Sequence, residues 1–144
     1  MKGATKVELK IPSLPEFVAV ARLAVAAIAS RMDFPYDAVD DIKVAVGEAC
    51  TNAIEHAACS DPPEGEINIS CYLEQDALVI EVDDRGPGFD PHLCAEPDVL
   101  SGGGLGLILI QALMDEVKLT SLAGQGTQVR MIKRLRPAPL TPAR

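Results

Sequence analysis

Three polar side chains recur at four-residue intervals between about Tyr36 and Ala58. Glu48, Asn52 and His56 are each four positions apart, so on a helix they project from one stripe. The carboxylate of Glu48 could accept a proton from an attacking hydroxyl group. The amide oxygen of Asn52 could coordinate a hard cation. Taken alone, a polar stripe on a helix is more often a solvated surface, and His56 could equally cap or pack the helix end.

A carboxylate and two glycines follow a second candidate element. The pattern Asp84-x-Gly86-x-Gly88 comes soon after the apolar run Ala77 to Val82, which is typical of a central strand. Glycines at these positions permit a tight turn and a close approach of a ligand to the backbone. In isolation the same residues are simply a turn, so this pattern acquires meaning only from its neighbours.

A run of glycines precedes the last expected helix. Gly102, Gly104 and Gly106 alternate with other residues at the start of a helix predicted from about Leu105 to Asp115. Backbone N–H groups and the positive end of the helix dipole would there face a phosphate group. A bare glycine run is more often a connection or a cap. The segment from Phe89 to Ser101 has no clear period and reads as a long loop.

Hydrophobic periodicity predicts the elements that must position these residues. Alternating apolar residues indicate strands at Val7–Ile11 and Ile67–Leu73. The apolar run Ala77–Val82 indicates a central strand, and two further strands, Lys118–Ser121 and Thr127–Leu135, are expected around the turn at 123–126. Apolar residues at spacings of three and four indicate a helix at about Tyr36–Ala58. Further helices are expected at about Pro15–Met32, which is rich in Ala, Val and Leu, and at about Leu105–Asp115 after the glycine run. Ser13 could cap the first helix. The almost continuous apolarity of that helix indicates that it is mostly buried or packs against a partner.

Composition limits the class of protein. A chain of 144 residues, 48% of them apolar, is long enough for one core and favours a single domain. The formal charge of −8 disfavours binding to nucleic acid or to an anionic membrane. The least polar segment, Phe17 to Ala29, is too short to span a bilayer, so we expect a cytoplasmic protein. Because no CxxC spacing occurs, we interpret all four cysteines as buried or incidental thiols: Cys50, Cys59, Cys71 and Cys94.

The order of the three motifs is improbable by chance and carries a resemblance. From about Val7 to Leu135 the chain resembles the GHKL superfamily of ATPases and kinases, which includes gyrase, Hsp90, MutL and histidine kinases. Within it, the chain is similar to the small anti-sigma factors that are serine-protein kinases. The matching segments are Glu48–His56 for the N box, Asp84–Gly88 for the G1 box, Gly104–Leu107 for the G2 box, and the Gly126-Thr127 step.

This resemblance implies a fold and a domain organisation. The fold is an α+β two-layer sandwich, with three helices on one face of a mixed, mainly antiparallel sheet. It is the Bergerat-type ATP-binding fold, in which ATP lies between the sheet, a helix and a loop. A single kinase domain would occupy residues 1–136, followed by a proline-rich tail at residues 137–144.

The resemblance also implies a role for each site residue. Glu48 would be the general base, and Asn52 would bind Mg²⁺ that bridges the phosphates of ATP. Asp84 would accept a hydrogen bond from the adenine amino group, supported by Thr127. Gly86 and Gly88 would leave room for the base, and the phosphates would be held around Gly102, Gly104, Leu105 and Gly106.

The function implied is that of a serine-protein kinase and anti-sigma factor. Such a protein phosphorylates an anti-anti-sigma partner with a STAS domain, sequesters an RNA polymerase sigma factor, and forms a homodimer. One departure is that Phe89 to Gly106 contains no Lys or Arg, whereas relatives often have a basic residue there. A nucleotide-gated binding module without kinase activity is therefore an alternative. A stress-signalling serine kinase that binds no sigma factor, and the catalytic domain of a histidine kinase, are others.

Overall fold

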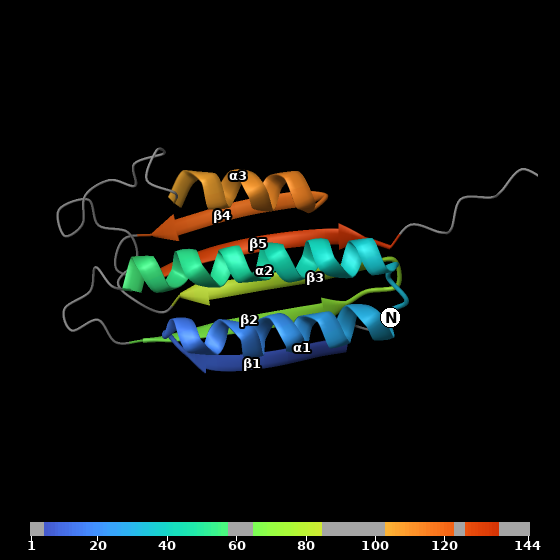
Figure 1. Ribbon diagram of the computed structural model, residues 1–144, viewed down its shortest axis with the longest axis horizontal. Coiled ribbons are helices and arrows are strands. Elements are labelled where there is room, and N and C mark those ends of the chain that lie inside the picture. The colour runs from blue at the N-terminus through green and yellow to red at the C-terminus, as the bar shows by residue number, and fades with distance from the viewer. Residues whose placement is uncertain (1–4, 58–64, 85–102, 123–125, 136–144) are drawn as a thin grey trace, which may run out of the picture.

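The computed structural model describes residues 5–57, 65–84, 103–122 and 126–135, and these residues form two layers (Figure 1). Within them, five strands make one sheet, and three α-helices cover one of its faces. The strands are β1 (Thr5–Pro12), β2 (Glu66–Leu73), β3 (Ala77–Asp84), β4 (Glu116–Leu122) and β5 (Gly126–Arg134). The helices are α1 (Val18–Arg31), α2 (Tyr36–Ala57) and α3 (Gly103–Leu113). This is the two-layer α+β sandwich expected from the sequence.

The sheet has the strand order β1-β2-β3-β5-β4, so β3 lies at its centre. The sheet was predicted to be mixed and mainly antiparallel. Each of the four pairings among the described strands is antiparallel. The central position of β3 explains its continuous apolar run. Both of its neighbours hydrogen-bond to it, and buried residues occur on both of its faces, as Val79 and Ile80 show.

The core lies between the sheet and the helices. Ile69, Val82 and Val129 are in register across β2, β3 and β5 and are at most 5% exposed. Residues in register on adjacent strands point to the same face of a sheet. The buried side chains of α1 are small and four residues apart, which lets this helix pack closely; they are Ala21, Val25 and Ala29.

The start of the first helix differs from the prediction. The chain enters through a 3₁₀ turn, η1 (Pro15–Phe17), whose N-cap is Leu14 and which makes no side-chain capping hydrogen bond. Ser13 is therefore not the cap, and the α-helix proper begins only at Val18. The hydroxyl of Ser13 is buried and has no hydrogen-bond partner among the described residues. Pro15 fixes the first turn instead, because its ring presets the backbone angle and its missing N–H is not needed there.

The last helix begins two residues earlier than predicted, at Gly103. Two glycines of the predicted run, Gly104 and Gly106, thus lie inside its first turn. The helix ends at Leu113, where the chain turns into β4 and the N–H of Asp115 donates to the carbonyl of Ile132 on β5. In the described parts of the chain, no helix is long and apolar enough to cross a membrane.

Candidate functional site

The elements that carry the predicted site residues converge at one end of the molecule. The C-terminal ends of α2 and β3 lie there, together with the first residues of α3 and β5 (left in Figure 1). This arrangement follows from chain direction, because α3 runs antiparallel to α2 and β5 runs antiparallel to β3. Motifs that are far apart in the sequence are thereby brought to one edge of the two layers.

Glu48 and Asn52 lie against the first turn of α3. A Cβ atom placed on Gly106 would be 3.0 Å from Glu48 Oε1 and 3.3 Å from Asn52 Oδ1. Gly106 itself is buried. The glycine thus leaves room for the side-chain oxygens of Glu48 and Asn52 beside the first turn of α3, which a Cβ atom would crowd. The structure brings the predicted general base, the predicted metal ligand and the predicted phosphate-binding turn into direct proximity.

Asp84 and Thr127 form the second part of the site. They are in register at the ends of β3 and β5 and are 4% and 7% exposed. Gly126, immediately before Thr127, has a φ angle of 97°, a conformation that glycine adopts without steric cost. Asp84 shares its face of the sheet with the core residue Val82, two positions earlier, so its carboxylate is on the helix-covered side.

The adjacent carboxylate, Asp83, lies on the opposite face. It accepts a hydrogen bond of 2.8 Å from the side-chain amide of Gln128, its register partner on β5. The sequence placed two consecutive aspartates at the end of this strand. The two-residue period of β3 separates them, since only Asp84 points toward the layer that holds Glu48 and Asn52.

The donor set fits a magnesium nucleotide. Oxygen atoms of carboxylates and amides are the ligands that Mg²⁺ prefers, and in phosphoryl-transfer sites the ion takes one or two of them together with phosphate oxygens. Asn52 Oδ1 and Glu48 Oε1 supply such atoms beside the N-terminal turn of α3. Backbone N–H groups of a first helical turn lack partners within the helix and attract anions.

Two buried thiols lie on the core side of these elements. Cys50, between Glu48 and Asn52 in sequence, is 0% exposed, and Cys71 on β2 is 2% exposed; both are free thiols. Burial raises the pKa of Cys50 to about 12 and that of Cys71 to about 11. Both thiols are therefore protonated at neutral pH, as suits packing residues rather than nucleophiles.

Several predicted positions lie outside the described residues. These are Gly86, Gly88 and Gly102, the loop from Phe89 to Ser101, the thiols of Cys59 and Cys94, and the tail at 137–144. Of Leu105 the structure places the helical backbone, and the same holds for His56 on α2. The roles assigned to these residues remain predictions.

The sequence matches the family described as histidine kinase-like ATPase domain over residues 11–133. It is similar to serine-protein kinase RsbW of Oceanobacillus iheyensis, with 44% identity over 134 residues, covering 86% of this chain and 84% of the relative. It is also similar to serine-protein kinase RsbW of Bacillus subtilis, with 41% identity over 132 residues, covering 85% of this chain and 82% of the relative.

Two solved structures share the fold. The RsbU and RsbW domains of a Mycobacterium tuberculosis protein superpose with a TM-score of 0.70 at 23% identity, covering 93% of this chain and 33% of that chain. A histidine kinase domain from the blue-light-activated kinase of Erythrobacter litoralis superposes with a TM-score of 0.57 at 24% identity, covering 94% of this chain and 65% of that one.

Proposed function

Because the chain belongs to the histidine kinase-like ATPase domain family and, within it, to the RsbW serine-protein kinases, we propose that it transfers the terminal phosphate of ATP to a serine of a partner protein. The observation that supports this proposal best is the position of Glu48 Oε1, 3.0 Å from the Cβ position of Gly106. A proton acceptor at the phosphate-binding end of α3 is what transfer to a hydroxyl group needs.

In this proposal, different residues of the chain perform different parts of the reaction. The incoming serine hydroxyl gives its proton to Glu48 while its oxygen bonds to the terminal phosphorus atom and the bond to the ADP oxygen breaks. Backbone N–H groups in the first turn of α3 hold the phosphates and offset their charge. Asn52 would hold Mg²⁺, which would supply positive charge to neutralise the charge that develops on the transferred group. Phosphoryl transfer relies on such positioning and electrostatic stabilisation more than on covalent help.

The nucleotide base is assigned to the sheet end of the site. Asp84 accepts a hydrogen bond from the adenine amino group, with Thr127 beside it. A buried carboxylate is costly unless its charge is stabilised, and a fixed acceptor of this kind discriminates an amino group from a carbonyl. Gly86 and Gly88 leave room for the base in this proposal.

The proposed protein partners are those of an anti-sigma factor. The substrate is an anti-anti-sigma protein with a STAS domain, and the second partner is a sigma factor, which the kinase sequesters in the cytoplasm.

We also propose that the chain forms a homodimer, since the outer face of α1 exposes Val20 at 47% and Leu23 at 65%. Large exposed apolar side chains on one helix face are typical of contact surfaces. Molar mass by light scattering tests the dimer, and a mass of 15.3 kDa would exclude it.

The test of the proposed activity uses purified full-length chain, Mg²⁺-ATP and a STAS-domain protein from the same genome. Serine phosphorylation, located by mass spectrometry, is the expected result. Nucleotide binding without transfer to any such partner would favour the nucleotide-gated binding module instead. That alternative is supported by the absence of Lys and Arg between Phe89 and Gly106. Phosphorylation of the partner without binding to any sigma factor would identify a stress-signalling kinase.

A further inference from the structure

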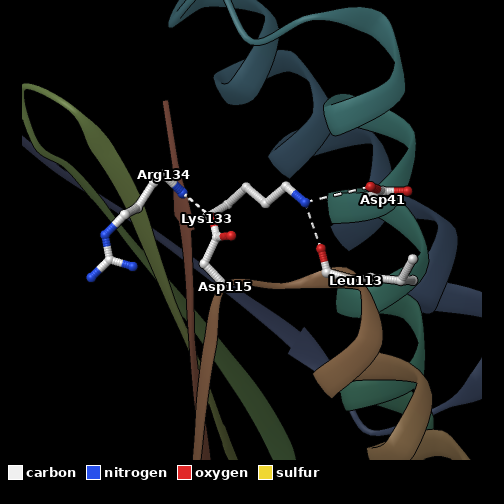
Figure 2. Close-up of polar contacts among 5 residues, drawn as sticks. All are labelled: Asp41, Leu113, Asp115, Lys133 and Arg134. Atoms are coloured by element: carbon white, nitrogen blue, oxygen red, sulfur yellow. Dashed lines mark hydrogen bonds and ion pairs between the residues drawn. The ribbon is translucent and has the colours of Figure 1, made fainter. Parts of the chain in front are cut away.

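The C-terminal end of α3, opposite to the site, is held by a partly buried lysine. Lys133 on β5 donates from Nζ to the carbonyl oxygen of Leu113 at 2.5 Å, and the same Nζ lies 3.4 Å from Asp41 Oδ2 on α2 (Figure 2). The lysine side chain is 12% exposed and that of Asp41 is 40% exposed. One ammonium group thus joins three elements: β5, α2 and the last residue of α3.

A second set of contacts fixes the turn that follows α3. The backbone N–H of Arg134 donates to Asp115 Oδ2 at 2.6 Å (Figure 2), and the backbone N–H of Asp115 donates to Ile132 at 2.9 Å. The end of α3 is therefore attached to β5 through this turn, whereas Lys133 is the contact that also reaches α2. The sequence offered only one hint of this arrangement. Asp41 precedes Glu48 by seven positions and shares its helical stripe.

The residues that meet at the two ends of the α2–α3 contact are separated by the same number of positions on both helices. On α2, Asp41 and Glu48 are seven residues apart, and on α3, Gly106 and Leu113 are also seven apart. Seven residues correspond to about 10.5 Å of helix. Since the helices are antiparallel (Figure 1), one pair of positions meets at the site and the other meets through Lys133. Between them in sequence, Ala45 and Ile110 are 0% exposed, so an apolar contact zone separates the two polar ends.

The physical chemistry of the lysine favours a fixed geometry. The last carbonyl groups of a helix lack partners within the helix and carry the negative end of its dipole. An ammonium group at that point is stabilised by the carbonyl and by the carboxylate of Asp41. Removing it leaves the Leu113 carbonyl and the carboxylate without their shared cation. An apolar contact zone alone specifies the axial position of one helix on another less sharply than a directional polar contact does.

We propose that Lys133 is a positioning residue, which sets the axial position of α3 on α2 and thereby the distance between the phosphate-binding turn at Gly106 and the side chains of Glu48 and Asn52. The inference rests on the proposed nucleotide-binding function of that turn. Its consequence is specific: loss of the lysine impairs contacts to the phosphates, at the first turn of α3, more than contacts to the base, at Asp84 on β3.

The experiment compares Lys133→Met, which keeps an unbranched side chain without charge, with the matched control Lys118→Met at an exposed position of β4. Affinities for Mg²⁺-ATP and for adenosine are measured by calorimetry at a temperature where every variant is folded. For Lys133→Met we expect ATP affinity to fall about 10-fold, since small misplacements of a binding group are costly, while adenosine affinity changes less than twofold. Lys133→Arg, which retains a cation, should recover part of the loss.

Hydrogen exchange of the ligand-free chain separates this inference from the proposed function. Amides of residues 106–110 should exchange faster in Lys133→Met, and those of β1 and β2 should not. The positioning role would be overturned if Lys133→Met bound ATP as tightly as the unmodified chain and showed the same hydrogen exchange in α3. It would also be overturned if the variant lost ATP and adenosine affinity to the same extent. If the unmodified chain binds no nucleotide, the proposed function fails. The exchange comparison then still decides whether Lys133 fixes α3.

Discussion

Asp83 and Asp84 are consecutive on β3, yet the first bonds to Gln128 on the open face of the sheet and the second is 4% exposed on the helix-covered face. This separation provides a matched pair for testing the adenine site. Asp84→Asn should weaken ATP binding by about 1.5 to 3 kcal/mol, the usual value of a hydrogen bond to a charged group. Asp83→Asn changes the same chemistry one residue away and should leave the affinity unchanged. Calorimetry with ATP measures both, and equal effects of the two substitutions would remove Asp84 from the adenine site.

Glu48 is expected to act in transfer and not in binding. Glu48→Gln keeps the size of the side chain beside Gly106 and removes its basicity. Phosphate transfer should slow by about 100- to 10,000-fold, as is usual for a lost general base, with ATP affinity nearly unchanged. Single-turnover transfer of labelled phosphate to the STAS-domain partner measures the rate. A normal rate in this variant would show that another group accepts the proton.

Gly106→Ala should separate stability from activity. The new Cβ would lie 3.0 Å from Glu48 Oε1, the end of a flexible side chain, so the carboxylate moves and the helices stay together. Replacing a helical glycine by alanine stabilises a helix by up to about 1 kcal/mol. We therefore expect unchanged or higher stability with slower transfer and weaker ATP binding.

Gly65→Ala is the control for this substitution, because a Cβ at Gly65 would meet no atom within 4 Å. Thermal unfolding and transfer rates of both variants give the comparison. Unimpaired transfer by Gly106→Ala would mean that the carboxylate position seen here is not the one used in the reaction.

Much of this architecture was predictable from local patterns. Alternating apolar residues predicted β1 and β2, each of which has one face in the core, whereas the central strand β3 was predicted from its continuous apolar run. The four-residue spacing of Glu48 and Asn52 correctly predicted that they share one helical stripe, because residues four apart lie on the same side of an α-helix. The start of the first helix was missed, because Ser13 looks like a cap and Pro15 instead begins a 3₁₀ turn.

Contacts between elements could not be predicted in this way. Gly106 and Glu48 are 58 positions apart in the sequence. They come close only because α2 and α3 pack against each other. In the sequence Lys133 is one polar residue near the end of a strand, yet its side chain is only 12% exposed and its ammonium group contacts both α2 and α3. Such a position depends on tertiary packing, which overrides the tendency of lysine to remain at the surface.

The buried thiol of Cys50 should make the fold sensitive to alkaline pH. Its pKa rises from 9.0 to about 12 on folding because burial disfavours the thiolate. Below pH 9 the thiol is protonated in both the folded and the unfolded chain, so its stabilising effect is fully present. Above pH 9 the unfolded chain loses the proton while the folded chain retains it. The free energy of unfolding therefore falls with pH until the folded pKa is reached.

Urea unfolding at pH 8, 9, 10 and 10.5 measures this dependence, and Cys50→Ala is the informative variant. Alanine fits a position that is 0% exposed without introducing a polar group, and it has no proton to lose. Lysines, tyrosines and the other cysteines titrate in both proteins, so the difference between the two curves isolates Cys50. The variant should lose less stability between pH 9 and 10.5 than the unmodified chain. Parallel curves would mean that the thiol of Cys50 ionises as readily in the folded state as in the unfolded one.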